Sequence, residues 1–117
     1  MRDFYEGFEG EPEIRFVAKV KGVPDQVLRI WDGYFDSIMA RIELKGGQWT
    51  GLALPYHLCE GWHDAPWKIE SLDSVVDQWR QIRTDGLPAG CGKVHVAILE
   101  LLTSVDAAGG EVWISEE

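Results

Sequence analysis

The sequence lacks the features of several large classes of protein. It has no apolar run near the ~18 residues that a membrane-spanning helix needs, so no such helix is expected. Its first residues show no basic segment followed by an apolar one, so a signal peptide is not expected. Its two cysteines, Cys59 and Cys91, could pair only once, and nothing else indicates export. These absences predict a cytoplasmic protein with free thiols.

Basic residues are scarce as well. Eleven Lys and Arg stand against 20 Asp and Glu, which gives a formal net charge of −9. A surface this negative repels phosphate backbones and anionic membranes, so neither nucleic acid nor a membrane is an expected partner. It would attract a basic protein and speed the encounter with it. Acidic domains without a basic partner are equally common, so charge alone does not identify one.

What the sequence does contain predicts a single folded domain over residues 1–117. The chain has the usual length of one domain, and 45% of its residues are hydrophobic and 26% charged. Six tryptophans are many for this length, which raises the expectation that some rings serve binding. Residues 1–12 predict an acidic, loosely held leader, with Phe4, Tyr5 and Phe8 as possible docking points.

The first half of the chain favours strands. Apolar and polar residues alternate over 14–20, the pattern of a half-buried strand, and a turn follows. The next apolar residues fall at helical spacing, but Asp32-Gly33 is a strong hairpin pattern, and alternation resumes over 38–44. A helix and a hairpin are both compatible with this stretch. Of the two we predict strands, as a meander over 26–31, 35–45 and 48–54.

The second half predicts one helix and two further strands. Ser71 can cap a helix over 71–83, Asp73 suits its positive end, and one stripe of it is apolar. Residues 93–103 are apolar on both faces, which predicts a central strand with His95 as a hydrogen-bonded core histidine. Residues 111–115 predict an edge strand. The fold class is therefore α+β: an antiparallel sheet of about six strands with one main amphipathic helix packed on one face.

The residues suited to chemistry form no standard motif. A zinc ion could be held by two imidazoles and two thiolates, but the spacing matches no standard zinc module. These residues are His57, Cys59, His63 and Cys91. Cys59 with a nearby histidine could instead serve a small enzyme or ligand-binding domain with its pocket between helix and sheet. We expect no catalytic residue, no metal and no cofactor.

Two segments combine large rings with carboxylates. Such rings anchor protein interfaces, and carboxylates beside them bind Arg or Lys. The candidate partner-binding residues are Asp32, Tyr34 and Asp36 at a predicted hairpin tip, and Glu60, Trp62 and Asp64 in a loop. Trp62 fits binding and packing equally well. Trp67 lies just before the helix, where packing is the favoured interpretation.

The same region carries a family resemblance. Gly61-Trp62, Pro66-Trp67 and Glu70, followed by the short acidic helix from Leu72 to Ile82, resemble immunity proteins of bacterial polymorphic-toxin and contact-dependent inhibition systems. The resemblance covers about a quarter of the chain. It implies tight binding to a cognate toxin, commonly a basic nuclease or tRNase. The leading hypothesis is thus an immunity protein, the second is the thiol enzyme or ligand-binding domain, and the third is self-association through exposed rings.

Overall fold

The computed structural model describes residues 2–42, 52 and 66–116 of the chain. This part contains five strands and three helices. In chain order they are β1 (Arg2–Phe4), β2 (Glu13–Lys19), β3 (Gln26–Trp31), α1 (Asp32–Met39), β4 (Trp67–Lys68), α3 (Leu72–Gln81), α4 (Cys91–Ala107) and β5 (Glu111–Glu116).

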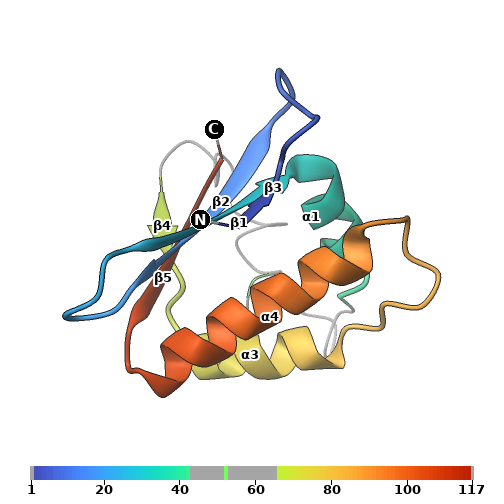
Figure 1. The fold of residues 1–117 in the computed structure, drawn as a ribbon. Coiled ribbons are helices and arrows are strands. Elements are labelled where there is room, and N and C mark those ends of the chain that lie inside the picture. The colour runs from blue at the N-terminus through green and yellow to red at the C-terminus, as the bar shows by residue number, and fades with distance from the viewer. Residues whose placement is uncertain (1, 43–51, 53–65, 117) are drawn as a thin grey trace.

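The strands form one mixed sheet in the order β1-β3-β2-β5-β4 (Figure 1). β1 runs parallel to β3, and the other neighbours are antiparallel. The α+β class is confirmed. The details were predicted wrongly: the sheet is mixed rather than antiparallel, and the described residues hold five strands rather than about six, and three helices rather than one. β5 is no edge strand, because it lies between β2 and β4.

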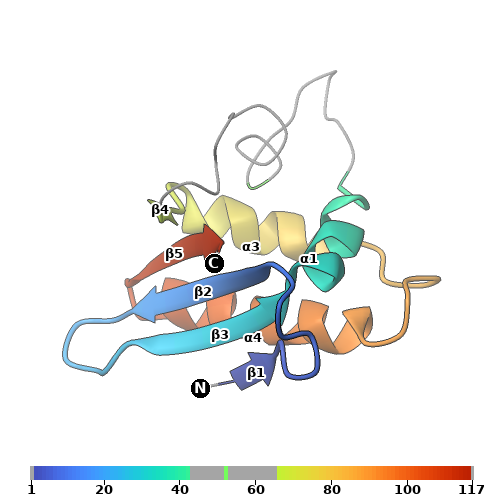
Figure 2. The ribbon, with the colours of Figure 1, turned by 90° about the horizontal axis from the view of Figure 1, so that it is seen from above.

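Alternation along the strands divides the sheet into a covered and an open face. Ile14 and Phe16 on β2, Leu28 on β3 and Ile114 on β5 are buried, and they point toward the helices. Figure 2 shows α3 and α4 on the same side of the sheet. The predicted strands over 14–20, 26–31 and 111–115 are confirmed, because two-residue periodicity reports correctly on a sheet with one buried face.

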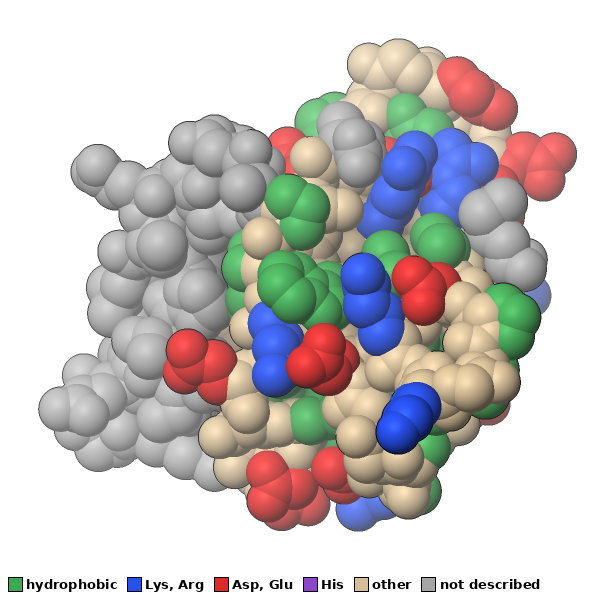
Figure 3. Space-filling view, turned by 90° about the vertical axis from the view of Figure 1, so that its left-hand side faces the viewer, with side chains coloured by type: hydrophobic (Ala, Val, Ile, Leu, Met, Phe, Trp, Pro, Cys, Tyr) green, Lys and Arg blue, Asp and Glu red, His purple; other side chains and the backbone are tan. Residues whose placement is uncertain are grey.

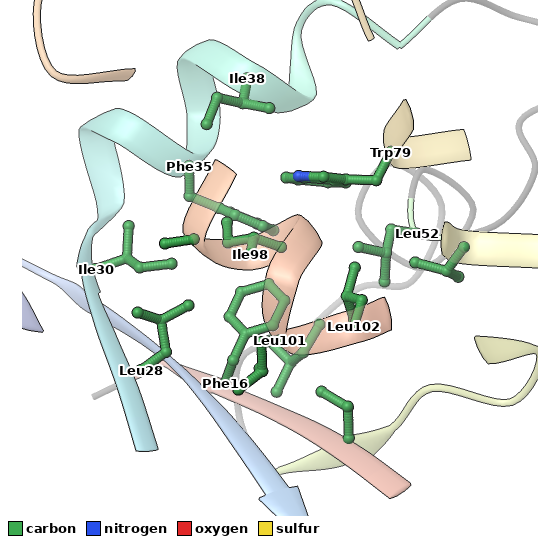
Figure 4. Packing of buried hydrophobic residues seen from close by; sticks show 14 of the residues in the cluster. Phe16, Leu28, Ile30, Phe35, Ile38, Leu52, Trp79, Ile98, Leu101 and Leu102 are labelled. Atoms are coloured by element: carbon green, nitrogen blue, oxygen red, sulfur yellow. The ribbon is translucent and has the colours of Figure 1, made fainter. Parts of the chain in front are cut away.

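The core fills the space between the sheet and the helices (Figure 4). Phe16 from β2 meets Phe35 from α1 edge to face, with ring centroids 5.8 Å apart. Leu52 is 2% exposed and belongs to the same core; its backbone N–H donates to the Oε1 atom of Gln78 on α3 at 3.0 Å. Dense packing here is the main source of stability for a domain of this size.

The predicted helix is confirmed as α3. Val75, Val76 and Trp79 are buried along the expected stripe. Ser71 occupies the N-cap position, but its side chain makes no capping hydrogen bond. The helix ends at Gln81, and Ile82 continues the buried stripe in extended conformation.

The prediction of a central strand over 93–103 is wrong, because these residues belong to α4. The buried positions recur at three- and four-residue intervals, as a helix requires. They include Cys91, Val94, His95, Ile98, Leu101, Leu102 and Val105. The outward position Val96 is also apolar and is 51% exposed, which removed the polar contrast that marks a helix in sequence. None of the helices in the described residues is long and apolar enough to cross a membrane.

The prediction of a strand over 35–45 is wrong for its first part. α1 begins at Asp32, directly after β3, so Asp32-Gly33 starts a helix and not a hairpin. Phe35, Ile38 and Met39 are buried against the core, which outweighs the local turn preference. The predicted strand over 48–54 lies outside the described residues, apart from Leu52.

Candidate partner-binding surface

The N-terminal leader folds into two consecutive turns. The Oδ1 atom of Asp3 accepts the backbone N–H groups of Tyr5 and Glu6, at 2.7 and 3.0 Å. Phe8 N–H donates to the carbonyl of Tyr5, and Glu11 N–H donates to the carbonyl of Phe8, both at 3.0 Å. The Tyr5 hydroxyl then donates to the carbonyl of Glu11 at 2.5 Å. These hydrogen bonds connect the successive turns of the leader.

Two glycines make these turns possible. Gly7 and Gly10 both have φ of +95°, a conformation that side-chain-bearing residues rarely adopt. The turns leave Glu6, Glu9 and Glu11 exposed to solvent. Three carboxylates therefore project from one short loop.

The same loop carries Phe8 into a cluster of three rings. Phe8 stacks on Trp31 with centroids 4.1 Å apart and an interplanar angle of 5°. Tyr34 meets both rings edge-on, at 5.5 Å from Phe8 and 5.1 Å from Trp31. All three residues are half-buried. We call Phe8, Trp31 and Tyr34 the aromatic cluster; together with Glu6, Glu9 and Glu11 it forms the acidic–aromatic surface.

The position of Trp31 depends on a glycine beside it. A Cβ atom at Gly33 would lie 2.4 to 2.7 Å from three carbons of the Trp31 ring. Only glycine lets α1 start this close to the indole. The Asp-Gly pair thus supports the aromatic cluster through close packing.

The structure brings together only part of the predicted site. Tyr34 belongs to the aromatic cluster. Asp32 and Asp36 each lie two residues from Tyr34 on α1, and two residues correspond to about 200° of rotation around a helix. Both carboxylates therefore occupy the flank of α1 opposite Tyr34. The other predicted residues, Glu60, Trp62 and Asp64, lie outside the described residues.

Sequence reasoning missed the combination of Phe8 with Trp31. Phe8 was named only as a possible docking point, and Trp31 only as a residue of a strand. The run Glu6-Gly7-Phe8-Glu9-Gly10-Glu11 could have revealed the loop, because its spaced glycines favour consecutive turns that expose the acids. No local pattern links it to Trp31.

An ion-pair network attaches the leader to the sheet. Arg29 on β3 holds Glu13 on β2 through two hydrogen bonds, each 2.8 Å long, and Asp3 through a third at 3.1 Å. Its guanidinium also lies 5.2 Å from the ring centroid of Tyr5. The Nε atom of Arg15 donates to Glu13 at 2.5 Å. The network fixes the base from which the leader loop projects.

The network shifts the pKa values of its members. The hydrogen bonds from Arg29, with a smaller contribution from Arg15, lower the pKa of Glu13 to about 2, although burial of this carboxyl acts in the opposite direction. The carboxylate of Glu13 correspondingly raises the pKa of Arg29. Glu13 is 4% exposed, so its charge is stabilised by these partners and hardly by water.

This network predicts a specific loss of stability in acid. The pKa of Glu13 is lower in the folded chain than its ordinary 4.5, so its contribution is complete above about pH 4.5 and is lost as pH falls toward about 2. We expect a loss of about 2 kcal/mol over this range, measured by urea denaturation at a series of pH values. Glu13→Gln should have a lower free energy of unfolding at neutral pH, and this free energy should change less between about pH 4.5 and 2 than in the wild type. If the free energies of the two proteins fell in parallel with pH, the role of Glu13 would be contradicted.

Cys91 and His95, two of the residues considered for catalysis, are buried in the domain. Cys91 begins α4 and is 1% exposed; burial raises the pKa of its thiol, and a hydrogen bond from Ser37 opposes that rise only in part. A nucleophilic thiol needs the opposite shift. His95 is buried, as predicted, and its Nε2 atom lies 2.8 Å from the carbonyl oxygen of Trp79.

A metal site gains no support within residues 2–42, 52 and 66–116. No group of three His, Cys, Asp or Glu in this part is placed to hold a metal ion. Cys91, one of the four candidate zinc ligands, is part of the core. The other three candidates lie outside the described residues: His57, Cys59 and His63.

Comparison with known proteins finds no relative: no family model, no curated protein and no solved structure matches this chain. Within the described residues, the acidic–aromatic surface brings together side chains suited to recognition.

Proposed function

We propose that this chain is an immunity protein that binds and neutralises a cognate bacterial toxin in the cytoplasm. The toxin that we propose is a basic protein, and a nuclease fits this description best. The acidic–aromatic surface provides the contact. The observation that carries the proposal is the aromatic cluster: three half-buried rings in mutual contact at the base of a loop that exposes three carboxylates.

The chemistry of this surface suits a basic protein. Large rings that are already fixed in place lose little entropy on binding, and they are the commonest anchors of protein interfaces. Exposed carboxylates around them form charge-assisted hydrogen bonds with Lys and Arg. The net charge of −9 adds long-range attraction for a cationic partner. A nuclease surface built for phosphates would meet carboxylates in their place.

The leader loop is also held ready for binding. Its turns, its ion pairs to Arg29 and the stack of Phe8 on Trp31 order it before any partner arrives. Pre-ordering reduces the entropic cost of association. Glu60, Trp62 and Asp64 remain predicted contacts of the toxin, and so do Asp32 and Asp36, which would reach it from the flank of α1 opposite Tyr34.

A pocket between helix and sheet, required by the second hypothesis, gains no support from the described residues. The side chains between the helices and the sheet form a packed core that includes Phe16, Phe35 and Ile98 (Figure 4). Protein binding on an outer surface agrees better with this filled interior.

The test is binding to the C-terminal domain of a large secreted protein encoded beside this gene. We expect calorimetry to give a 1:1 complex of nanomolar affinity, and we expect the complex to abolish the toxic activity. The association rate should fall as salt is added, because charge steers the encounter. A candidate toxin that neither binds nor is neutralised would refute the proposal for that pair. Absence of binding to every such neighbour would refute it altogether.

A further inference from the structure

The face of the sheet turned away from the helices is covered by no described element (Figures 1 and 2). Figure 3 looks onto this side of the molecule, where Lys and Arg side chains lie among hydrophobic ones, with Asp and Glu beside them. We call it the open face. Strand alternation places on it Asp3, Glu13, Arg15, Val17, Lys19, Val27, Arg29, Lys68, Glu111, Trp113 and, at one end, Trp31, on which Phe8 of the leader loop stacks.

An apolar stripe crosses the middle of the open face. Val27, Val17 and Trp113 are direct neighbours in register on β3, β2 and β5. The indole N–H of Trp113 donates to Glu111 at 3.3 Å, and the Nζ atom of Lys19 lies 5.8 Å from the ring centroid. These contacts hold the ring in one orientation. The stripe is therefore a fixed, half-buried apolar surface at the centre of the sheet.

The charges around the stripe are paired with one another. Arg29 holds Glu13 and Asp3, and Arg15 also holds Glu13. Lys68 lies 3.0 Å from Glu111, and Lys19 lies 4.0 Å from Asp25 in the turn beside it. Four cations thus face four anions. The charges around the stripe therefore balance, and the excess of −9 comes from the rest of the chain, which includes the exposed acids of the leader loop at the Trp31 end of this face.

We propose that two copies of this chain associate through their open faces. Each copy carries −9, so most surfaces of two copies repel one another. The centre of the open face is an apolar stripe surrounded by charges that balance one another. Two sheets pack face to face at about 10 Å, and a two-fold axis in the plane between them brings the two stripes together. The paired charges form a polar rim of both signs.

A second copy fits this face better than the other classes of partner. A polyanion finds no net positive charge there, because each cation already has a carboxylate partner. A basic protein is attracted to the acidic remainder of the surface. The stripe also lies four residues along β3 from Trp31, about 13 Å away, so the inference does not depend on the proposed function.

The experiment is sedimentation of the chain alone from about 1 µM to about 1 mM. We expect the mass to rise reversibly from one chain to two. Val17→Lys and Val17→Glu should each weaken the dimer at least tenfold, because like charges then face each other across the two-fold axis. An equimolar mixture of the two variants should restore association. Val27→Lys and Val27→Glu form a second pair in case a charge on the central strand impairs folding.

The matched control is Val96→Lys on the outer side of α4, where the side chain is 51% exposed. It adds the same charge away from the open face and should leave the dimer unchanged. A wild-type chain that stays monomeric throughout would overturn the proposal. So would a Val96→Lys effect equal to that of Val17→Lys, or failure of the mixture to associate. Binding of a single-stranded oligonucleotide to a monomeric chain, lost in Val17→Glu, would assign the face to an anionic partner instead.

Toxin binding and dimerisation can fail separately. Phe8→Ala in the leader loop should leave the sedimentation series unchanged. A chain that dimerises but binds no toxin would refute only the proposed function. A chain that binds toxin but never dimerises would refute only this inference.

Discussion

Trp79→Ala should remove most of the stability of this domain, with a loss of about 3–5 kcal/mol in the free energy of unfolding. Trp79 is 0% exposed and is among the largest side chains of the core. Its ring lies parallel to that of His95, with centroids 5.7 Å apart and an interplanar angle of 10°. Alanine would leave a large cavity between α3 and α4. Urea denaturation followed by far-UV circular dichroism measures the loss.

Reciprocal hydrogen bonds add to the effect. The indole N–H of Trp79 donates to the carbonyl of His95 at 3.1 Å, and the Nε2 atom of His95 lies 2.8 Å from the carbonyl of Trp79. A carbonyl can only accept, so Nε2 carries the proton. Trp79→Phe keeps an aromatic ring but removes the indole N–H. The lost hydrogen bond should lower the free energy of unfolding by about 1 kcal/mol, in addition to the effect of the smaller ring on packing. Trp113→Ala, at a half-buried ring, should cost far less; equal losses for the two alanine variants would contradict the central place of Trp79.

Phe8→Ala should weaken toxin binding by at least about 2 kcal/mol while the fold stays intact. Phe8 is half-buried on a loop, so its removal opens no cavity in the core, but it takes away one face of the stack on Trp31. Calorimetry against the toxin measures the loss. Val23→Ala in the turn between β2 and β3, 51% exposed, is the matched control and should bind as the wild type does.

Gly33→Ala tests the same cluster without removing a ring. The added methyl group would come within 2.4 Å of the Trp31 ring and must displace it. Affinity should fall together with the stack, and the toxin-facing carboxylates stay in place. Wild-type affinity in both Phe8→Ala and Gly33→Ala would remove the aromatic cluster from the interface.

The sequence predicted the elements whose pattern depends on one buried face. Apolar and polar residues recur with the period of a strand in β2, β3 and β5 and with that of a helix in α3. These elements could therefore be recognised from the sequence. α4 failed this condition, because Val96 is apolar on its outer side and Leu99 extends the apolar surface beyond the fully buried positions. α1 failed for another reason: Asp32-Gly33 favours a turn locally, while burial of Phe35 and Ile38 favours a helix. Tertiary packing overrode the local preference.

The candidate site could be predicted only in part for a related reason. Tyr34 and its neighbouring acids were visible as a local combination of ring and carboxylate. A hairpin tip would present Tyr34 and these acids together. The structure has a helix here, which places Asp32 and Asp36 on the opposite flank from Tyr34. Phe8 and Trp31 are distant in sequence. They meet because β1 pairs in parallel with β3, which brings the loop after β1 to the end of β3. Contacts of this kind depend on topology, which the periodicity of single segments does not contain.

Amide hydrogen exchange of the chain alone and in complex with its toxin tests the acidic–aromatic surface most directly. We expect strong new protection in residues 5–12 and 31–36, where the leader loop and the aromatic cluster lie. We expect no change on the outer side of α4 around Val96. Protection confined to α3 and α4, with the leader exchanging as fast as in the free chain, would contradict the acidic–aromatic surface as the binding site.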